Sequence, residues 1–259
     1  MQTVLFHDTV FGPIHSRRLG TSLGINLLPN DGKLCSFDCL YCEAGFNAQG
    51  PGTTGFPRRE EVAAKLEDKL KAMKQNGERL DVITFSGNGE PTLHPDFEGI
   101  IDDTVSVRDR YFPDVKISVL TNSTQLTRPG VVRALGRVDN NILKLDSAVE
   151  NTMRMLDRPN SPGFTVRRAI DGIAAFGQKA IVQTMFTRGS YNGESFDNTT
   201  ETEIDALIDA YRKISPGSIM IYSLDRKTPA DDLHRVEKGE LMRIAARIEK
   251  ATGIPVTVA

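Results

Sequence analysis

The sequence predicts an α/β fold built on a parallel β-sheet, and the order of its apolar segments is the main reason. Short apolar runs alternate with amphipathic helical patterns about six times, which predicts right-handed βαβ crossovers. The polar and glycine-rich turns that follow these runs would share the carboxyl edge of the sheet, where ligands bind in such folds. We therefore expect a doubly wound sheet or an incomplete barrel, with one ligand site.

The predicted strands are short apolar runs bounded by turn-forming residues. A run rich in turn formers at 11–20 leads into the first of them. The strands are expected at 23–28, 81–86, 116–120, 141–145, 180–186 and 218–223, with a terminal apolar segment at 256–258.

The predicted helices carry apolar residues three and four positions apart and end near glycine or proline. Thr200 followed by Glu203 is typical of a capping box, in which each residue satisfies a backbone N–H of the other. The helices are expected from 62 to near 77, at 95–110, from 166 to before 177, at 200–211 and from 241 to before 253, with a short one beginning near Pro129.

All three cysteines lie within eight residues, as Cys35, Cys39 and Cys42. Thiolates are soft ligands that suit Fe–S clusters or zinc, and three on one short loop can hold a metal centre from one side. The fourth coordination position would stay open to a small molecule, which favours chemistry over structural stapling. The cysteine loop is therefore the predicted centre of the site.

Other polar turns follow the later strands and would meet the cysteine loop at the same edge. Their glycines can expose backbone groups to a ligand, and guanidinium groups suit carboxylates and phosphates. These turns are Gly87-Asn88-Gly89-Glu90, Thr121-Asn122, Lys144 to Ser147, Thr187-Arg188-Gly189 and Asp225-Arg226.

The composition is that of an ordinary soluble globular protein, with 39% hydrophobic and 25% charged residues. The net charge of -2 gives no bulk basic field for nucleic acid. No apolar segment is long enough to span a membrane, and the N-terminus has no signal-peptide pattern. We expect a cytoplasmic protein with no membrane partner, in a compartment that keeps the cysteines reduced.

The spacing Cys35, Cys39, Tyr41, Cys42 resembles the Cys-x3-Cys-x-aromatic-Cys motif of radical S-adenosylmethionine (SAM) enzymes. The glycine turn at 87–90 is similar to the Gly-Gly-Glu motif of that superfamily, with Asn88 inserted. The resemblance implies a partial (β/α)6 TIM-type barrel in one domain, 1–259, with 1–22 as an N-terminal extension and 23–259 as the barrel. More narrowly, 16–26, 86–92 and 222–226 resemble small bacterial and archaeal proteins related to wyosine-type tRNA-modifying enzymes.

The resemblance also implies an activity. Three thiolates would hold a [4Fe–4S] cluster, and the methionine end of SAM would bind its free iron. Reductive cleavage of SAM would give a 5′-deoxyadenosyl radical that abstracts hydrogen from an unidentified substrate, in an oxidoreductase- or transferase-like reaction. The substrate would be a small molecule, a protein or a tRNA, and the electron donor a flavodoxin- or ferredoxin-type protein.

Site residues are carried over by position. Tyr41 is expected beside adenine, and Gly87, Asn88, Gly89 and Glu90 at the methionine amino end of SAM. The residues expected to reach ribose or carboxylate are Asn122, Lys144, Asp146, Ser147 and Gln183. Lys144 and Asp146 share a strand face and could instead pair with each other. The candidate substrate contacts are Arg17, Arg18, Arg188 and Arg226.

Other interpretations remain open at this point. The cysteines could form a Cys3His zinc site with His7, His15 or His94. A cluster could also serve a non-catalytic binding or electron-transfer module. Among enzymes, the chain lacks the extra cysteines of wyosine-forming relatives, and in size it resembles glycyl-radical activating enzymes.

Overall fold

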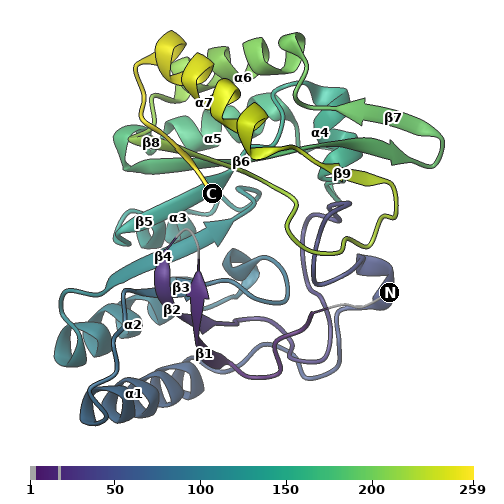
Figure 1. Cartoon of the computed structure of the whole chain (residues 1–259). Helices are drawn as coiled ribbons and strands as arrows, with labels where there is room; N and C mark the ends of the chain where they lie inside the picture. The colour runs from purple at the N-terminus through teal and green to yellow at the C-terminus, as the bar shows by residue number, and fades with distance from the viewer. Residues whose placement is uncertain (1–3, 17–18) are drawn as a thin grey trace.

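The computed structural model describes residues 4–16 and 19–259, and it has the α/β fold with a mostly parallel sheet that the sequence predicts (Figure 1). Neighbouring strands from β2 to β10 pair in parallel, whereas β1 is antiparallel to β2. The order ends at β1 and β10, so the described sheet stays open, as in an incomplete barrel. In sheet order the strands are β1 (Val10–Ser16), β2 (Gly20–Ile25), β3 (Val82–Phe85), β4 (Lys116–Thr121), β5 (Asn140–Lys144), β6 (Ala180–Tyr191), β8 (Ser218–Ser223) and β10 (Val256–Val258).

Helices fill the crossovers between consecutive parallel strands, and neighbouring helices pack together, as α1 with α2 and α6 with α7 (Figure 1). The apolar stripe predicted for α1 is buried. Within the described residues, no helix is both long and apolar enough to cross a membrane. The helices are α1 (Arg59–Gln75), α2 (Phe97–Tyr111), α3 (Pro129–Leu135), α4 (Glu150–Leu156), α5 (Val166–Ala174), α6 (Glu201–Ile214) and α7 (Lys238–Thr252).

The run at 11–20, which is rich in turn formers, supplies most of β1, a strand that was not among the predicted elements. Strand β1 is an edge strand, and its register with β2 shifts between Phe11 and Ile14. Pro13 lies inside this irregularity, where the missing N–H costs the sheet no hydrogen bond. Turn formers therefore coexist with a strand here because the strand is at an edge.

The first parallel strand, predicted at 23–28, begins earlier and ends at Ile25. The side chain of Asn26 donates to Leu28 O at 3.1 Å and accepts from Leu28 N at 3.3 Å, so the chain turns there. Leu27 and Leu28 are nevertheless buried. Their apolar character reflects core packing under the cysteine loop, which the strand pattern alone does not distinguish.

Strand β6 is longer than predicted, because its second half leaves the parallel sheet. Residues 187–191 pair antiparallel with β7 (Glu194–Asp197) and β9 (Leu233–Arg235). The turn predicted at 187–189 is therefore a strand. Helix α4 was also missing from the predicted elements, since its seven residues give too short a periodic pattern.

The capping box predicted at the start of α6 is only half formed. Thr200 accepts a hydrogen bond from Glu203 N at 3.4 Å, as predicted. The Glu203 carboxylate is buried and accepts instead from Ser147 Oγ at 2.6 Å and Thr152 Oγ1 at 2.5 Å. Glu203 thus ties α6 to the segment after β5 and to α4.

We expect Thr200→Ala to lower the free energy of unfolding by about 1 kcal/mol, the usual cost of a lost N-cap. Glu203→Ala should cost more, about 2–3 kcal/mol, because it removes the buried acceptor of two hydroxyl groups. Urea unfolding of the two variants measures both values. A smaller loss in Glu203→Ala than in Thr200→Ala would contradict this assignment.

Candidate active site

The cysteine loop lies against the glycine turn that follows β3. Leu34 N donates to Asn88 O at 2.9 Å, and Glu90 N donates to Leu34 O at 3.1 Å, which forms a parallel bridge between Leu34 and Gly89. Gly89 has φ +141°, and a Cβ there would lie 1.9 Å from Leu34 O. Only glycine lets the two backbones approach this closely.

The cysteines and the glycine turn line one cavity of about 220 Å³ at the carboxyl ends of β3, β4 and β5. Lys144 and Gln183 are register partners in β5 and β6, and both reach it. Ten of the predicted site residues line it, namely Cys35, Cys39, Tyr41, Cys42, Gly87, Gly89, Glu90, Asn122, Lys144 and Gln183. Sequence segments far apart are therefore brought to one place, as the strand order predicts.

In this structure the thiols make local contacts. Cys35 Sγ accepts from Phe37 N and from Asn122 Nδ2, both at 3.5 Å, and Cys39 Sγ donates to Asp157 Oδ1 at 3.6 Å. Accordingly, no three His, Cys, Asp or Glu side chains of the described residues form a ready metal-binding group. Burial raises the pKa of Cys35 to about 12, and burial with the Asp157 charge raises that of Cys39.

These residues fit an iron–sulfur cluster in the type of their donors and in the cavity they share. Three soft thiol ligands face one space, with no fourth cysteine in the chain to close the coordination. Binding requires that the thiols turn from their local partners and lose their protons, as metal binding to cysteine always does. The opposite walls offer backbone and amide groups to a ligand of the cluster.

No histidine is among the described residues that line this cavity. His94 is buried, with Nδ1 accepting from Asp96 N at 3.1 Å and Nε2 lying 2.8 Å from Pro57 O. His7 lies near Asn30 O, and His15 lines a different cavity. A Cys3His zinc site with one of these three histidines is not formed here.

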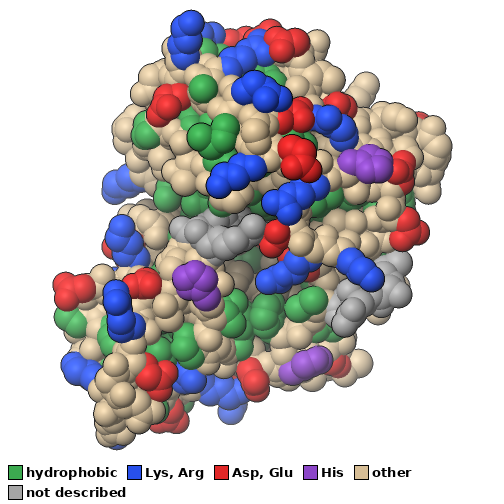
Figure 2. All heavy atoms as spheres, in the orientation of Figure 1, with side chains coloured by type: hydrophobic (Ala, Val, Ile, Leu, Met, Phe, Trp, Pro, Cys, Tyr) green, Lys and Arg blue, Asp and Glu red, His purple; other side chains and the backbone are tan. Residues whose placement is uncertain are grey.

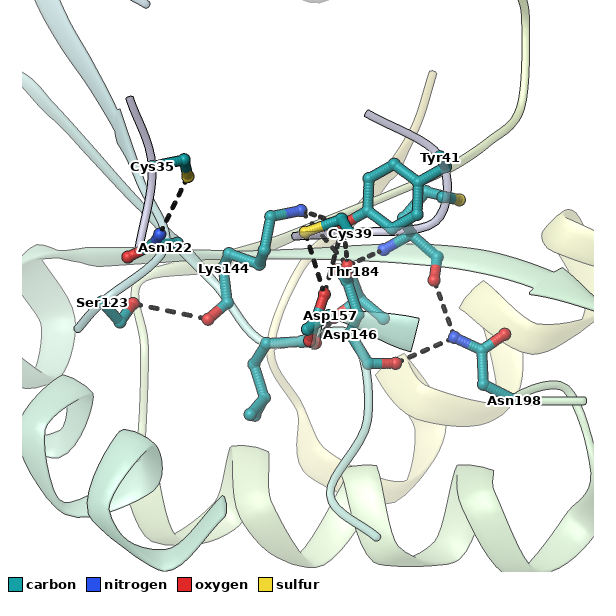
Figure 3. Close-up of polar contacts among 12 residues, drawn as sticks. Cys35, Cys39, Tyr41, Asn122, Ser123, Lys144, Asp146, Asp157, Thr184 and Asn198 are labelled. Atoms are coloured by element: carbon teal, nitrogen blue, oxygen red, sulfur yellow. Dashed lines mark hydrogen bonds and ion pairs between the residues drawn. The ribbon is translucent and has the colours of Figure 1, made fainter. Parts of the chain in front are cut away.

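Tyr41 belongs to a buried polar network beside the cysteines, on the cavity side of their loop (Figure 3). Its hydroxyl donates to Asp146 and accepts from Lys144, whose Nζ also pairs with Asp146 at 3.2 Å. Lys144 lies 4.8 Å from the centre of the Tyr41 ring, a cation–π contact. The pairing of Lys144 with Asp146, one of the two predicted alternatives, is therefore present.

Charge balance in this network explains the pKa shifts. Burial is the largest single effect and would lower the pKa of Lys144, but the charges of Asp146, Tyr222, Cys39 and Asp157 together outweigh it, and the net shift is upward. Burial and the Asp146 charge raise the pKa of Asp157 and that of Tyr41. The Asp146 carboxylate also accepts a hydrogen bond from Met185 N at 2.9 Å, which ties Asp146 to the neighbouring strand β6. The network therefore holds the Tyr41 ring in one orientation.

Glu90 connects the glycine turn to the end of β4. Its Oε2 accepts from Asn122 N at 2.7 Å, and its Oε1 accepts from Thr92 and Thr121 hydroxyls at 2.5 and 2.7 Å. Burial raises its pKa, and these hydrogen bonds partly oppose that rise. Asn122 Nδ2 in turn donates to Ser36 Oγ at 2.9 Å. Glu90 thus positions Asn122 beside the cysteine loop.

Five predicted site residues of the described chain lie outside the cysteine cavity, and one of them, Arg226, lines a second cavity. Asn88 reaches the N-terminal segment, donating to Phe6 O and Pro29 O at 2.8 Å. Asp146 lies behind Tyr41, and Ser147 turns to Glu203. Arg188 pairs with Asp197 at 3.3 Å and with Glu240.

Arg226 pairs with Glu43 at the rim of a second cavity, of about 290 Å³. Arg17 and Arg18 lie outside the described residues. Tyr41, Ser86, Leu120 and Tyr222 line both cavities, so the second is adjacent to the first. The second cavity also opens beside β1 and β10, at the two ends of the sheet order.

Two charged residues of the site have no counterpart in the sequence-based assignment. Asp157 lies 118 positions from Cys39, so no local pattern connects them. Lys33 is buried two positions before Cys35. The only sequence signal for a role of Lys33 is its position, because it is a charged residue between the apolar run at 27–28 and the cysteines.

The chain belongs to the radical SAM superfamily, whose sequence profile matches residues 30–202. It is 32% identical over 197 residues to a UPF0026 protein of Methanocaldococcus jannaschii, covering 74% of this chain and 58% of the relative. It is 27% identical over 254 residues to a protein named GTPase Obg of Brachyspira hyodysenteriae, covering 96% of this chain and 35% of that one. The chain thus spans only part of both relatives.

Solved structures show the same fold. A radical SAM methyltransferase of Sphaerobacter thermophilus has a TM-score of 0.65 at 16% identity, over 92% of this chain and 65% of that one. SuiB of Streptococcus suis bound to S-adenosylmethionine has a TM-score of 0.62 at 17% sequence identity, and the match covers 88% of this chain and 48% of SuiB. TYW1 with a lysine–pyruvate adduct bound has a TM-score of 0.59 at 12% sequence identity, and the match covers 90% of this chain and 75% of that one. These likenesses agree with the partial-barrel fold.

We expect Gly89→Ala to separate the cysteine loop from the glycine turn and to cost more than about 3 kcal/mol of stability. Gly77→Ala is the matched control, since Gly77 also has positive φ but a Cβ there would meet nothing within 4 Å. The control should cost only about 1 kcal/mol of backbone strain. Equal losses in urea unfolding would show that the contact with Leu34 is unimportant.

Burial lowers the pKa of His94 in the folded protein. Below about pH 6.5 the unfolded chain then binds a proton that the folded chain refuses, so stability falls as the pH drops. We expect part of this loss to disappear in His94→Gln. Urea unfolding at pH 7.5, 6.5 and 5.5 measures it, and identical pH slopes in both proteins would refute the assignment.

Proposed function

We propose that this chain is a radical SAM enzyme that cleaves SAM reductively at a [4Fe–4S] cluster and abstracts hydrogen from a substrate. The observation that carries the proposal is the shared cavity of Cys35, Cys39 and Cys42 with the glycine turn, in a chain of this superfamily. When bound, the cluster supplies one electron to SAM, giving methionine and a 5′-deoxyadenosyl radical. We treat 1–259 as one radical SAM domain, with 1–22 as its N-terminal extension.

Each side chain has a role in binding and orientation. Cys35, Cys39 and Cys42 would hold the cluster, and Gly87 and Gly89, which line the same cavity, would offer backbone groups to the amino end of SAM. Asn122, Lys144 and Gln183 offer an amide, an ammonium and a second amide to ribose and carboxylate. Tyr41 is held by Asp146 and Lys144, so its ring can form a fixed wall for adenine.

We place the substrate in the second cavity, because it shares four wall residues with the first. Chemistry that a bound cluster and SAM would supply at this common wall would be adjacent to a substrate held in the second cavity. Of the four arginines predicted to contact substrate, Arg226 is the one among the described residues that lines the second cavity. It is therefore the candidate substrate contact.

The substrate class is open among small molecules, proteins and tRNA. Likeness to TYW1 supports a relation to wyosine-type tRNA-modifying enzymes. The net charge of -2 weighs against tRNA, as does the mixture of acidic and basic side chains on the face seen in Figure 2. We further propose a cytoplasmic setting and a flavodoxin- or ferredoxin-type donor, since the thiols must stay reduced.

The test is anaerobic reconstitution with iron and sulfide, followed by SAM and dithionite. We expect a brown protein that releases 5′-deoxyadenosine, and Cys39→Ala should abolish both the cluster and the product. Ser106→Ala, on the exposed side of α2, is the control and should behave as the wild type. A colourless protein that carries zinc and leaves SAM intact would disprove the proposal.

A further inference from the structure

Lys33 is a buried ammonium held by the cysteine loop itself. The residue is 3% exposed, and its Nζ donates to Gly45 O at 2.8 Å and pairs with Asp38 Oδ1 at 3.4 Å. Asp38 lies between the first two cysteines, and Gly45 comes three residues after the third. Lys33 does not line either cavity, so it packs behind the loop and not on its ligand side.

The charges around Lys33 do not balance. Asp38 also accepts from Asn47 N at 2.6 Å and pairs with Arg158 at 3.2 Å, so two cations share one carboxylate. Arg158 lies over the rings of Phe46 and Tyr191, which fixes it at this place. One net positive charge is therefore left in and behind the loop. Burying an unbalanced charge is costly unless a charge of opposite sign lies nearby.

Thiolates supply that opposite charge when a cluster is bound. A [4Fe–4S] core with three thiolates is negative, and its one-electron reduction adds another negative charge in a region of low dielectric. A fixed ammonium behind the loop stabilises the reduced form more than the oxidised form. It therefore moves the reduction potential toward less negative values.

We propose that Lys33 is a positioning residue that acts as a fixed countercharge and makes the bound cluster easier to reduce. The inference rests on the proposed function, because it requires a cluster on Cys35, Cys39 and Cys42. It goes beyond it by assigning a role to a residue outside the three-cysteine motif. Lys33 would touch neither SAM nor substrate.

The experiment is a redox titration of the anaerobically reconstituted full chain without SAM, followed by electron paramagnetic resonance, with iron and sulfide content measured in parallel. Lys33→Met removes the charge at similar length and should shift the midpoint potential to more negative values. Lys33→Arg should restore much of the wild-type value. The matched control is Lys65→Met, which removes a half-exposed lysine of α1 paired with Glu61 and should leave the potential unchanged.

The variant Asp38→Asn should shift the midpoint potential in the opposite direction. It removes the negative charge that partly neutralises Lys33 and keeps a side-chain acceptor of the same shape, so the potential should become less negative. This variant decides the question if Lys33→Met does not load a cluster.

An unchanged potential in a fully loaded Lys33→Met protein, or shifts of the same sign in Lys33→Met and Asp38→Asn, would overturn the inference and leave the proposed function intact. Wild-type protein that takes up no iron–sulfur cluster would overturn the proposed function, and the role of Lys33 with it. Cluster loading in the wild type thus separates the two failures.

Discussion

Two backbone hydrogen bonds between Leu34 and the glycine turn hold the cysteine loop at the carboxyl end of β3. The loop has little regular structure of its own, so its position depends on this contact and on the bonds from Asp38 N and Leu40 N to the segment at 156–158. One side of the loop is thus attached to the first half of the sheet and the other to the segment that follows β5 and α4. The cavity is the space between these attachments.

The sheet explains why the remaining groups meet the loop. Successive parallel strands end at one edge, so residues after β3 and β4, at the end of β5 and within β6 line the same cavity. Buried hydrogen bonds then set individual orientations: Glu90 fixes Asn122, and Asp146 fixes Tyr41. A buried carboxylate is costly, and these two are tolerated because their oxygens accept several hydrogen bonds.

Sequence patterns predicted which loops form the site better than which side chains point into it. The cysteine spacing and the glycine turn identified the cavity, since strand order alone brings them together. The orientations of Asn88 and Ser147 depend on Phe6 and Glu203, which are distant in sequence and leave no local pattern. Arg188 lies outside the cysteine cavity for another reason: β6 continues into an antiparallel ladder, where a turn was predicted.

The charged groups on the two sides of the cysteine loop differ. Asp157, Asp146 and Lys144 form a network on the cavity side of the loop, where Lys144 pairs with Asp146 and where burial and the Asp146 charge raise the pKa of Asp157. On the opposite side, Lys33 and Arg158 share only Asp38. The loop therefore lies between a network of two carboxylates and one ammonium on its cavity side and two cations that share one carboxylate on the opposite side. A metal centre on this loop would gain electrostatic stabilisation from behind, while the polar groups in front stay available to orient its ligand.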